Sequence, residues 1–210
     1  PFIRPDVPNS SFLGFDSFTY KYIVCCGNPP GPDSNIATVS YLVIRNDDAQ
    51  NAGSCRLRRY GGLMPSDSAG EPVNVTNGNM WLEQMDYSLG GRGDRIEVNR
   101  FYNSIIQSSG HFGFGWTTKY DESLEIFSDG KMIRLNQADG RAVYFGRPDQ
   151  SQPYRSYSPD TTGSITVNAN GTYKLTLFDG GSRNFTAGGA LISSADRNGN
   201  TTTLTYNSGG

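Results

Sequence analysis

The stretch "FSDGKMIRLNQADGRAVYF" (residues 127–145) decides the fold of this chain. It contains two Asp-Gly pairs, Asp129-Gly130 and Asp139-Gly140, and each is followed by a segment rich in β-branched and aromatic residues. Asp, Asn and Gly tolerate the positive φ that two-residue hairpin turns demand. The pattern therefore predicts two successive β-hairpins.

The same turn signal recurs along much of the chain. A third copy, "LFDGGSRNF" (residues 177–185), again places Asp-Gly ahead of a basic residue and a terminal aromatic residue. In residues 172–178, Tyr173, Leu175 and Leu177 alternate with mainly polar residues, which predicts a strand with one apolar face. Hairpins of this kind bury their apolar faces only by stacking on one another, so we expect an all-β, antiparallel hairpin meander. The Asn-Gly and Asp-Gly pairs begin at residues 77, 129, 139, 170, 179 and 198.

The composition supports strands and excludes several kinds of partner. Among 210 residues there are 26 Gly, 12 Tyr and 11 Phe, which favours short strands joined by turns. The net charge of -2 leaves no broad basic field, so we expect no nucleic acid partner. No apolar run approaches the roughly 18 residues that a membrane span requires. The first residues lack the pattern of a signal peptide, so an exported chain would have its signal removed or encoded upstream.

Residues 196–200, "DRNGN", could begin a calcium loop or form a turn that leads into a strand. An EF-hand loop needs glycine at its sixth position and glutamate at its twelfth. Counted from Asp196, these positions hold Thr201 and Asn207. We therefore predict a turn followed by a strand over 201–206, and no metal site.

The N-terminal part of the chain has a different organisation. Residues 14–24 and 36–44 alternate as two strands, whereas residues 47–70 have no periodicity and are predicted to be a linker. We expect a partial β segment over 1–46 and the hairpin region over 71–210. A few strands with one apolar face are marginal alone, so something else is expected to complete the first segment.

Three cysteines leave one thiol over after a single disulfide. We expect a bond from Cys55 to either Cys25 or Cys26, because a bond between adjacent cysteines would strain the backbone. A metal site is not expected, since there is no CxxC motif and the only histidine, His111, is distant in sequence.

The sequence contains few groups suited to catalysis. His111 could be a general base, but no nucleophile motif or hydrogen-bond partner is suggested for it. Asp121, Glu122 and Glu125 could supply the acid and base of a glycosidase. On a strand, however, Asp121 and Glu125 would share a face opposite to Glu122, which fits a solvated edge better than a cleft. We predict no catalytic residue and no cofactor site.

Other motifs have simpler explanations than binding. Arg92-Gly93-Asp94 spells an integrin-recognition tripeptide, but it lies in a glycine-rich turn. Asp47-Asp48 could bind calcium between domains, although the companion acidic motifs are not evident. Tyr154 and Tyr157 could belong to an exposed strip that binds carbohydrate, or could pack within a loop. Glycosylation sequons begin at Asn9, Asn74, Asn170, Asn184 and Asn200.

Several separated motifs occur in an order that is typical of one family. They are Pro72-Val73-Asn74, Asn77-Gly78-Asn79, Asp86-Tyr87, Arg100-Phe101-Tyr102-Asn103, and Phe112-Gly113 with Gly115-Trp116. With these motifs, residues 70–135 resemble the domain that opens the repeat region of RHS (YD-repeat) proteins. Residues 185–207 are similar to one repeat unit, with Asp196, Gly199 and Tyr206 at motif positions. Phe185-Thr186 replaces the usual Tyr-Asp pair.

A second, shorter resemblance covers the first segment. "DSFTY" (residues 16–20) and "ATVSYLVI" (residues 37–44) resemble the closing strands of a cadherin-like or bacterial immunoglobulin-like domain. The resemblance implies a partial immunoglobulin-like β-sandwich within residues 1–46.

The resemblance to RHS proteins implies a sheet that spirals into a hollow shell in longer relatives. We expect a non-catalytic structural module of an exported bacterial protein, secreted or at the cell surface, that forms a shell wall or an adhesive scaffold. Its partners would be other parts of a longer chain, other copies through strand complementation, a toxin segment or carbohydrate. The alternatives are a self-assembling fibre subunit and, with no motif in its favour, a polysaccharide-active enzyme.

Overall fold

The computed structural model describes residues 14–21, 35–43, 68–69, 73–74, 78–90, 96–157 and 163–207. All regular structure in these residues is β-strand, and every strand pair is antiparallel. The predicted all-β antiparallel fold is therefore confirmed. Across these residues, no helix has the length and apolarity that crossing a membrane would require. The chain divides into two units, residues 1–46 and 47–210.

The described part of the first unit is a single hairpin. Strand β1 (Gly14–Tyr20) pairs with β2 (Ala37–Val43) along its whole length, from Gly14 opposite Val43 to Tyr20 opposite Ala37. Both predicted strands are present, and the first ends earlier than the sequence pattern indicated.

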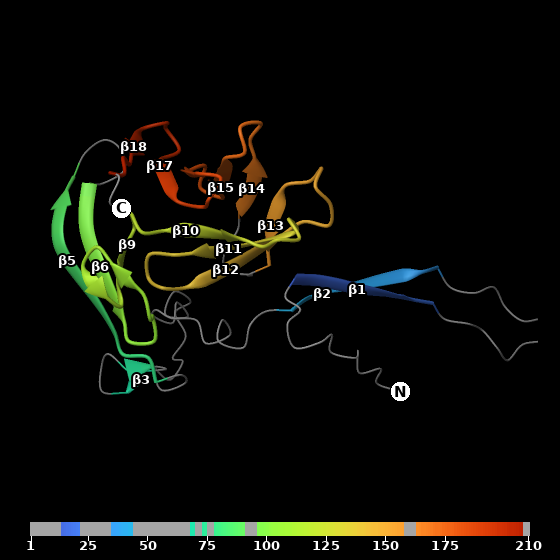
Figure 1. The fold of residues 1–210 in the computed structure, drawn as a ribbon, viewed down its shortest axis with the longest axis horizontal. Helices are drawn as coiled ribbons and strands as arrows, with labels where there is room; N and C mark the ends of the chain where they lie inside the picture. Colours follow the sequence, from blue (N-terminus) through green and yellow to red (C-terminus); the bar gives the residue numbers. More distant parts are fainter. Residues whose placement is uncertain are drawn as a thin grey trace, which may run out of the picture. The chain divides into compact units, whose positions relative to one another are not determined.

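The second unit is dominated by a nine-stranded sheet in which the strands follow one another in chain order (Figure 1). Each strand pairs with the strands directly before and after it in sequence, so the predicted meander is confirmed. The sheet curls, turning from β10–β12 toward β17 and β18 in Figure 1. Its strands are β10 (Ser123–Ile126), β11 (Met132–Asn136), β12 (Ala142–Gly146), β13 (Tyr154–Ser156), β14 (Gly163–Val167), β15 (Tyr173–Leu177), β16 (Ser182–Phe185), β17 (Leu191–Ala195) and β18 (Thr201–Thr203).

One hydrogen-bond pattern recurs in the turns. Between β11 and β12, the Gly140 amide donates to the Gln137 carbonyl at 2.9 Å, and the Gln137 amide donates to the Arg141 carbonyl at 2.8 Å. This is a three-residue loop with glycine in the left-handed region, and it corrects the predicted two-residue turn. Only glycines have positive φ among the described residues, so the preceding Asp or Asn keeps negative φ. The amide of the corresponding glycine makes the same bond at Gly130, Gly171, Gly180, Gly189 and Gly199.

The residue before the glycine contributes through its side chain. Asp139 Oδ1 accepts a hydrogen bond from the Arg141 amide at 3.1 Å, and Asp179 Oδ1 accepts one from the Gly181 amide at 2.9 Å. Asp and Asn suit this position because their short side chains can satisfy a backbone donor two residues ahead. The repeated Asp-Gly and Asn-Gly pairs therefore encode the turns locally.

The core runs across the sheet as a continuous apolar layer. Its members are less than 5% exposed and come from every strand from β10 to β17. Tyr154 lies in this layer at 1% exposure, which excludes it from an exposed carbohydrate strip and leaves the packing alternative. Its hydroxyl donates to the Gly130 carbonyl at 2.8 Å, and burial raises the pKa of its phenol. The buried cluster consists of Leu124, Ile133, Leu135, Val143, Phe145, Tyr154, Ile165, Leu175, Phe185 and Leu191.

A three-stranded sheet precedes the repeats. It consists of β5 (Trp81–Leu89), β6 (Ile96–Asn103) and β9 (Trp116–Thr118), in that order, with a bulge between Met85 and Tyr87. Two short hairpins accompany it, formed by β3 (Ser68–Ala69) with β4 (Val73–Asn74) and by β7 (Ser109–Gly110) with β8 (Gly113–Phe114).

Buried polar side chains join this sheet to the nine-stranded sheet. Asn103, 1% exposed, accepts a hydrogen bond from Asn79 Nδ2 at 2.8 Å and donates one to the Asp139 carbonyl at 3.0 Å. The Thr117 hydroxyl donates to the Ala138 carbonyl at 2.7 Å. These bonds hold the β11–β12 turn against the end of β6 and the start of β9, so the two sheets meet at a defined position.

Candidate functional site

A pocket of about 290 Å³ lies where the β7–β8 hairpin meets the end of the described chain. His111 is in the turn of that hairpin, and Tyr206 follows β18. The pocket is lined by His111, Phe112, Thr118, Tyr120, Leu204, Thr205, Tyr206 and Asn207.

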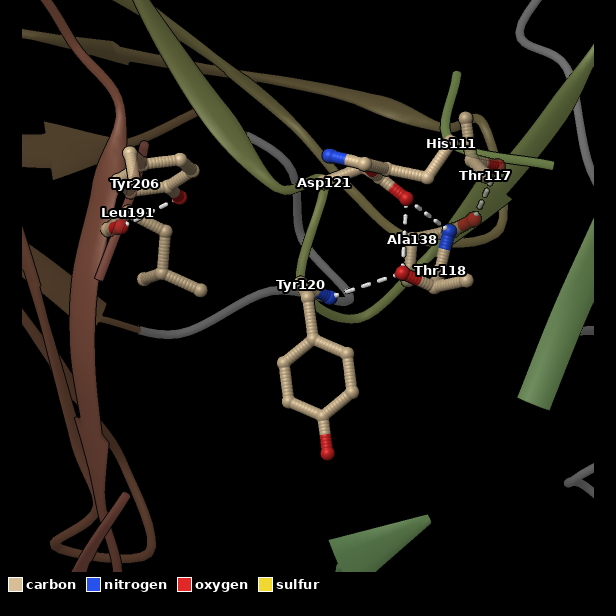
Figure 2. Close-up of polar contacts among 8 residues, drawn as sticks. All are labelled: His111, Thr117, Thr118, Tyr120, Asp121, Ala138, Leu191 and Tyr206. Carbon is tan, nitrogen blue, oxygen red and sulfur yellow. Dashed lines mark hydrogen bonds and ion pairs between the residues drawn. The ribbon is translucent and has the colours of Figure 1, made fainter. Parts of the chain in front are cut away.

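Asp121 anchors this site, as Figure 2 shows. Its Oδ2 accepts hydrogen bonds from the Thr118 amide at 2.8 Å and from the Thr118 hydroxyl at 2.7 Å. Its Oδ1 lies 2.8 Å from His111 Nδ1. A carboxylate oxygen accepts hydrogen bonds and does not donate them, so we assign a proton to His111 Nδ1. In the neutral imidazole this tautomer leaves Nε2 as an acceptor.

The sequence suggested no partner for His111, and the structure corrects this. Asp121 lies after β9, in a turn where its own amide donates to the Thr118 carbonyl at 3.0 Å. This turn brings the Asp121 carboxylate back to the β7–β8 loop. The pairing depends on how β9 lies beside β7, which no local motif encodes.

Among the residues that the structure describes, no hydroxyl or thiol completes a hydrolytic triad with His111 and Asp121. The nearby hydroxyl, that of Thr118, donates to Asp121 and accepts from the Tyr120 amide at 3.2 Å. A nucleophile in such a triad would instead hydrogen-bond to the histidine. The contact joins the β7–β8 loop to the turn after β9, and the His111 ring lines the pocket.

Tyr206 forms the opposite wall of the pocket. Its hydroxyl donates to the Leu191 carbonyl at 2.7 Å, which fixes the residues after β18 against β17 (Figure 2). Burial, and to a smaller extent the Asp121 carboxylate, raise the pKa of Tyr206. The phenol therefore stays neutral through the physiological range.

A larger cleft of about 710 Å³ lies between β6 and the β16–β18 end of the nine-stranded sheet. Glu122 and Arg183 both line this cleft and form an ion pair, with Glu122 Oε2 2.5 Å from Arg183 Nη1. The Glu122 side chain is 5% exposed. At the rim, Lys119 Nζ lies 3.7 Å from Glu97 Oε1. The cleft thus carries charges of both signs.

The three candidate carboxylates have separate partners. Strand β10 begins at Ser123, so Asp121 and Glu122 precede it, and the predicted shared strand face of Asp121 and Glu125 is wrong. Asp121 binds Thr118 and His111 as described above, Glu122 pairs with Arg183 in the cleft, and Glu125 pairs with Arg134 at 3.1 Å. Each carboxylate therefore has a structural role, and the predicted solvated edge does not describe Glu122.

The geometry of residues 196–200 does not support the alternative of a calcium-binding loop. Asp196 Oδ1 accepts from the Asn198 amide at 2.8 Å and from the Asn200 amide at 2.9 Å, and Oδ2 accepts from Asn200 Nδ2 at 2.7 Å. These bonds lower the pKa of Asp196, with the Asn200 side chain contributing most. The carboxylate is thus used within the turn. A strand follows as predicted, but β18 covers Thr201–Thr203 and is shorter than the predicted 201–206. No cluster of metal-ligating side chains occurs in the part of the chain that the structure describes.

Several candidates lie outside the described residues. These are the disulfide candidates Cys25, Cys26 and Cys55, the pair Asp47-Asp48, the tripeptide Arg92-Gly93-Asp94, and Asn9. Tyr157 is 51% exposed. The sequons at Asn170 and Asn200 lie in turns, and that at Asn184 lies in β16, where its Nδ2 donates to Ser193 Oγ at 3.0 Å.

Some residues that organise this region were not identified from the sequence as functional. Asn79 and Asn103 were noted only as parts of family motifs. Their hydrogen bonds to each other and to the Asp139 carbonyl explain why asparagine occupies these buried positions. Gly189 and Arg183 carried no signal, because each acts through a partner that is distant in the chain. The importance of a half-buried arginine, or of a glycine outside the Asp-Gly pattern, cannot be judged from sequence without knowing which residue it contacts.

Residues 70–145 match the model of a protein family described as a domain of unknown function (DUF6531). The matched segment includes the three-stranded sheet, His111, Asp121 and the first strands of the nine-stranded sheet. No match to the chain was found among curated proteins.

Proposed function

We propose that this chain is a non-catalytic structural β-repeat module of an exported bacterial RHS-type protein, in which it forms part of a shell wall or a surface scaffold. The observation that carries the proposal is the strict sequential order of the nine-stranded sheet with one turn geometry used repeatedly. A sheet built in this way can be extended by adding hairpins at its last edge.

The two ends of the sheet support a directional role. At the start, Asn103 and Thr117 hold the β11–β12 turn against the three-stranded sheet, which suits a domain that opens the repeats. At the other end, β18 pairs only with β17 among the described strands. Edge strands that lack a partner are templates for further pairing. Further strands could therefore pair with β18 and extend the sheet into a wall.

The side chains favour a mechanical role over catalysis. His111 and the three candidate carboxylates Asp121, Glu122 and Glu125 are engaged in contacts that join loops and strands. The β1–β2 hairpin would be the end of a cadherin-like or bacterial immunoglobulin-like domain that links the wall to a neighbouring part of the protein.

The proposal is tested by extending the full chain. A second copy of residues 173–203 is appended after Asn207, and hydrogen exchange is measured at Thr201–Thr203. We expect the amides that face outward from β18 to gain at least about tenfold protection, because the added strands pair with them. The control carries alanine in place of the three positive-φ turn glycines of the appended copy, which correspond to Gly180, Gly189 and Gly199. Equal exchange in both proteins would refute growth from this edge.

A further inference from the structure

We propose that the pocket around His111 binds one neutral pyranose ring of a polysaccharide. This goes beyond the proposed function, since a wall or scaffold needs no ligand, and either can hold without the other. The inference rests on three properties of the pocket, namely its aromatic walls, its polar groups and its charge.

The walls are aromatic and remain accessible. Phe112 and Tyr206 are each 45% exposed, and Tyr120 lines the same small pocket. A tyrosine combines an apolar ring with a hydroxyl, so it suits a ligand that has one apolar face and hydroxyl groups at its edge. A pyranose presents a face of C–H groups to such a ring and directs its hydroxyls to the sides.

The polar groups match hydroxyl donors and acceptors. Asp121 holds His111 Nδ1, so Nε2 accepts a hydrogen bond from a ligand hydroxyl. The Tyr206 hydroxyl already donates to Leu191 and can still accept. Asn207 and Thr205 line the same pocket and can add donors and acceptors.

The absence of charged lining residues selects against ionic ligands. Within the described residues, the lining contains no Lys, Arg, Asp or Glu, and the Asp121 carboxylate behind it accepts three hydrogen bonds. Close to the lining, Arg100 has its Cζ 5.3 Å from the Phe112 ring centroid and is already paired with Asp86. A phosphate or uronate would therefore meet no unpaired cation in the lining. The volume of about 290 Å³ is at the small end for ligand sites, which suits one ring and not a long chain.

The test titrates neutral methyl hexosides into the full chain and follows the His111 ring resonances by NMR. We expect saturable shifts with a Kd on the order of 1 mM. Phe112→Ala should weaken binding at least about tenfold by this readout, and His111→Ala should do the same when the Tyr206 ring resonances, which report on the same pocket, are followed instead. Phe114→Ala is the matched control, because Phe114 is 59% exposed on the neighbouring strand and does not line the pocket.

The titration of the wild-type chain can overturn the proposal by itself, so the test does not depend on whether a variant folds. Unchanged His111 resonances at roughly 50 mM of every neutral hexoside, a concentration far above the expected Kd, would refute it. Tighter binding of glucuronate or a sugar phosphate than of the neutral hexosides would also refute it. Loss of binding in Phe114→Ala with retention in Phe112→Ala would place the ligand elsewhere.

Discussion

The Leu124 amide donates a 2.8 Å hydrogen bond to the Gly189 carbonyl, and this contact joins the first strand of the nine-stranded sheet to the turn between β16 and β17. Ser123 and Ala190 form a bridge beside it. Gly189 has φ +91°, and a β-carbon there would lie 1.9 Å from the Leu124 carbonyl oxygen. The curl of the sheet therefore depends on the absence of a side chain at one position.

Gly189→Ala should destabilise the chain by about 2 kcal/mol or more, because both the positive φ and the contact with Leu124 become unfavourable. The midpoint of thermal unfolding should fall by roughly 5 °C. Gly188→Ala is the control, since a β-carbon there meets only Thr186 Oγ1 at 3.8 Å. Equal melting temperatures for the two variants would show that the closure contact is dispensable.

Glu122→Gln should cost about 2 kcal/mol in the free energy of unfolding, because Arg183, 25% exposed, then loses its charged partner and the buried Glu122 position holds a neutral amide. Glu125→Gln should cost at most about 1 kcal/mol, because the Glu125 side chain is 39% exposed. Urea denaturation measures both. In the double variant Glu122→Gln/Arg183→Met, the loss should be smaller than the sum of the single losses, and strict additivity would argue against direct coupling.

Asn103→Ala should lower the free energy of unfolding by about 2 to 3 kcal/mol, since it removes buried hydrogen bonds to Asn79 and to the Asp139 carbonyl. Asn136→Ala, which removes one bond to Ser123 Oγ in a half-buried position, should cost about 1 kcal/mol. Hydrogen exchange should also show faster opening of the β11–β12 turn in Asn103→Ala. Unchanged exchange there would mean that this network does not hold the two sheets together.

The Asp196 carboxyl should titrate below its ordinary pKa of 3.8, because Asn200 and the neighbouring amides stabilise the ionised form. A lowered folded-state pKa means that this stabilisation is complete above pH 3.8 and is lost as the pH falls further, through the folded pKa. NMR of the carboxyl carbon gives the midpoint. In Asn200→Ala the midpoint should move up toward 3.8, and a midpoint that stays in place would assign the shift to another cause.

Much of the second unit could be predicted because its information is local. The Asp139-Gly140 pair and its counterparts define turns through hydrogen bonds that span at most five residues. The alternation of Tyr173, Leu175 and Leu177 likewise needs no distant partner to indicate a strand. The turn geometry itself was missed, because the same two residues fit a two-residue or a three-residue loop.

Local residue preferences alone dictated that this chain forms antiparallel hairpins in sequential order, since turn chemistry and strand alternation act over a few residues. Only the folded chain decided that Tyr154 is buried, that Asp121 holds His111, and that Glu122 meets Arg183. Each of these depends on the curl of the nine-stranded sheet and on its contacts with the three-stranded sheet. Those arrangements come from contacts between residues far apart in sequence, whose distances no local pattern encodes.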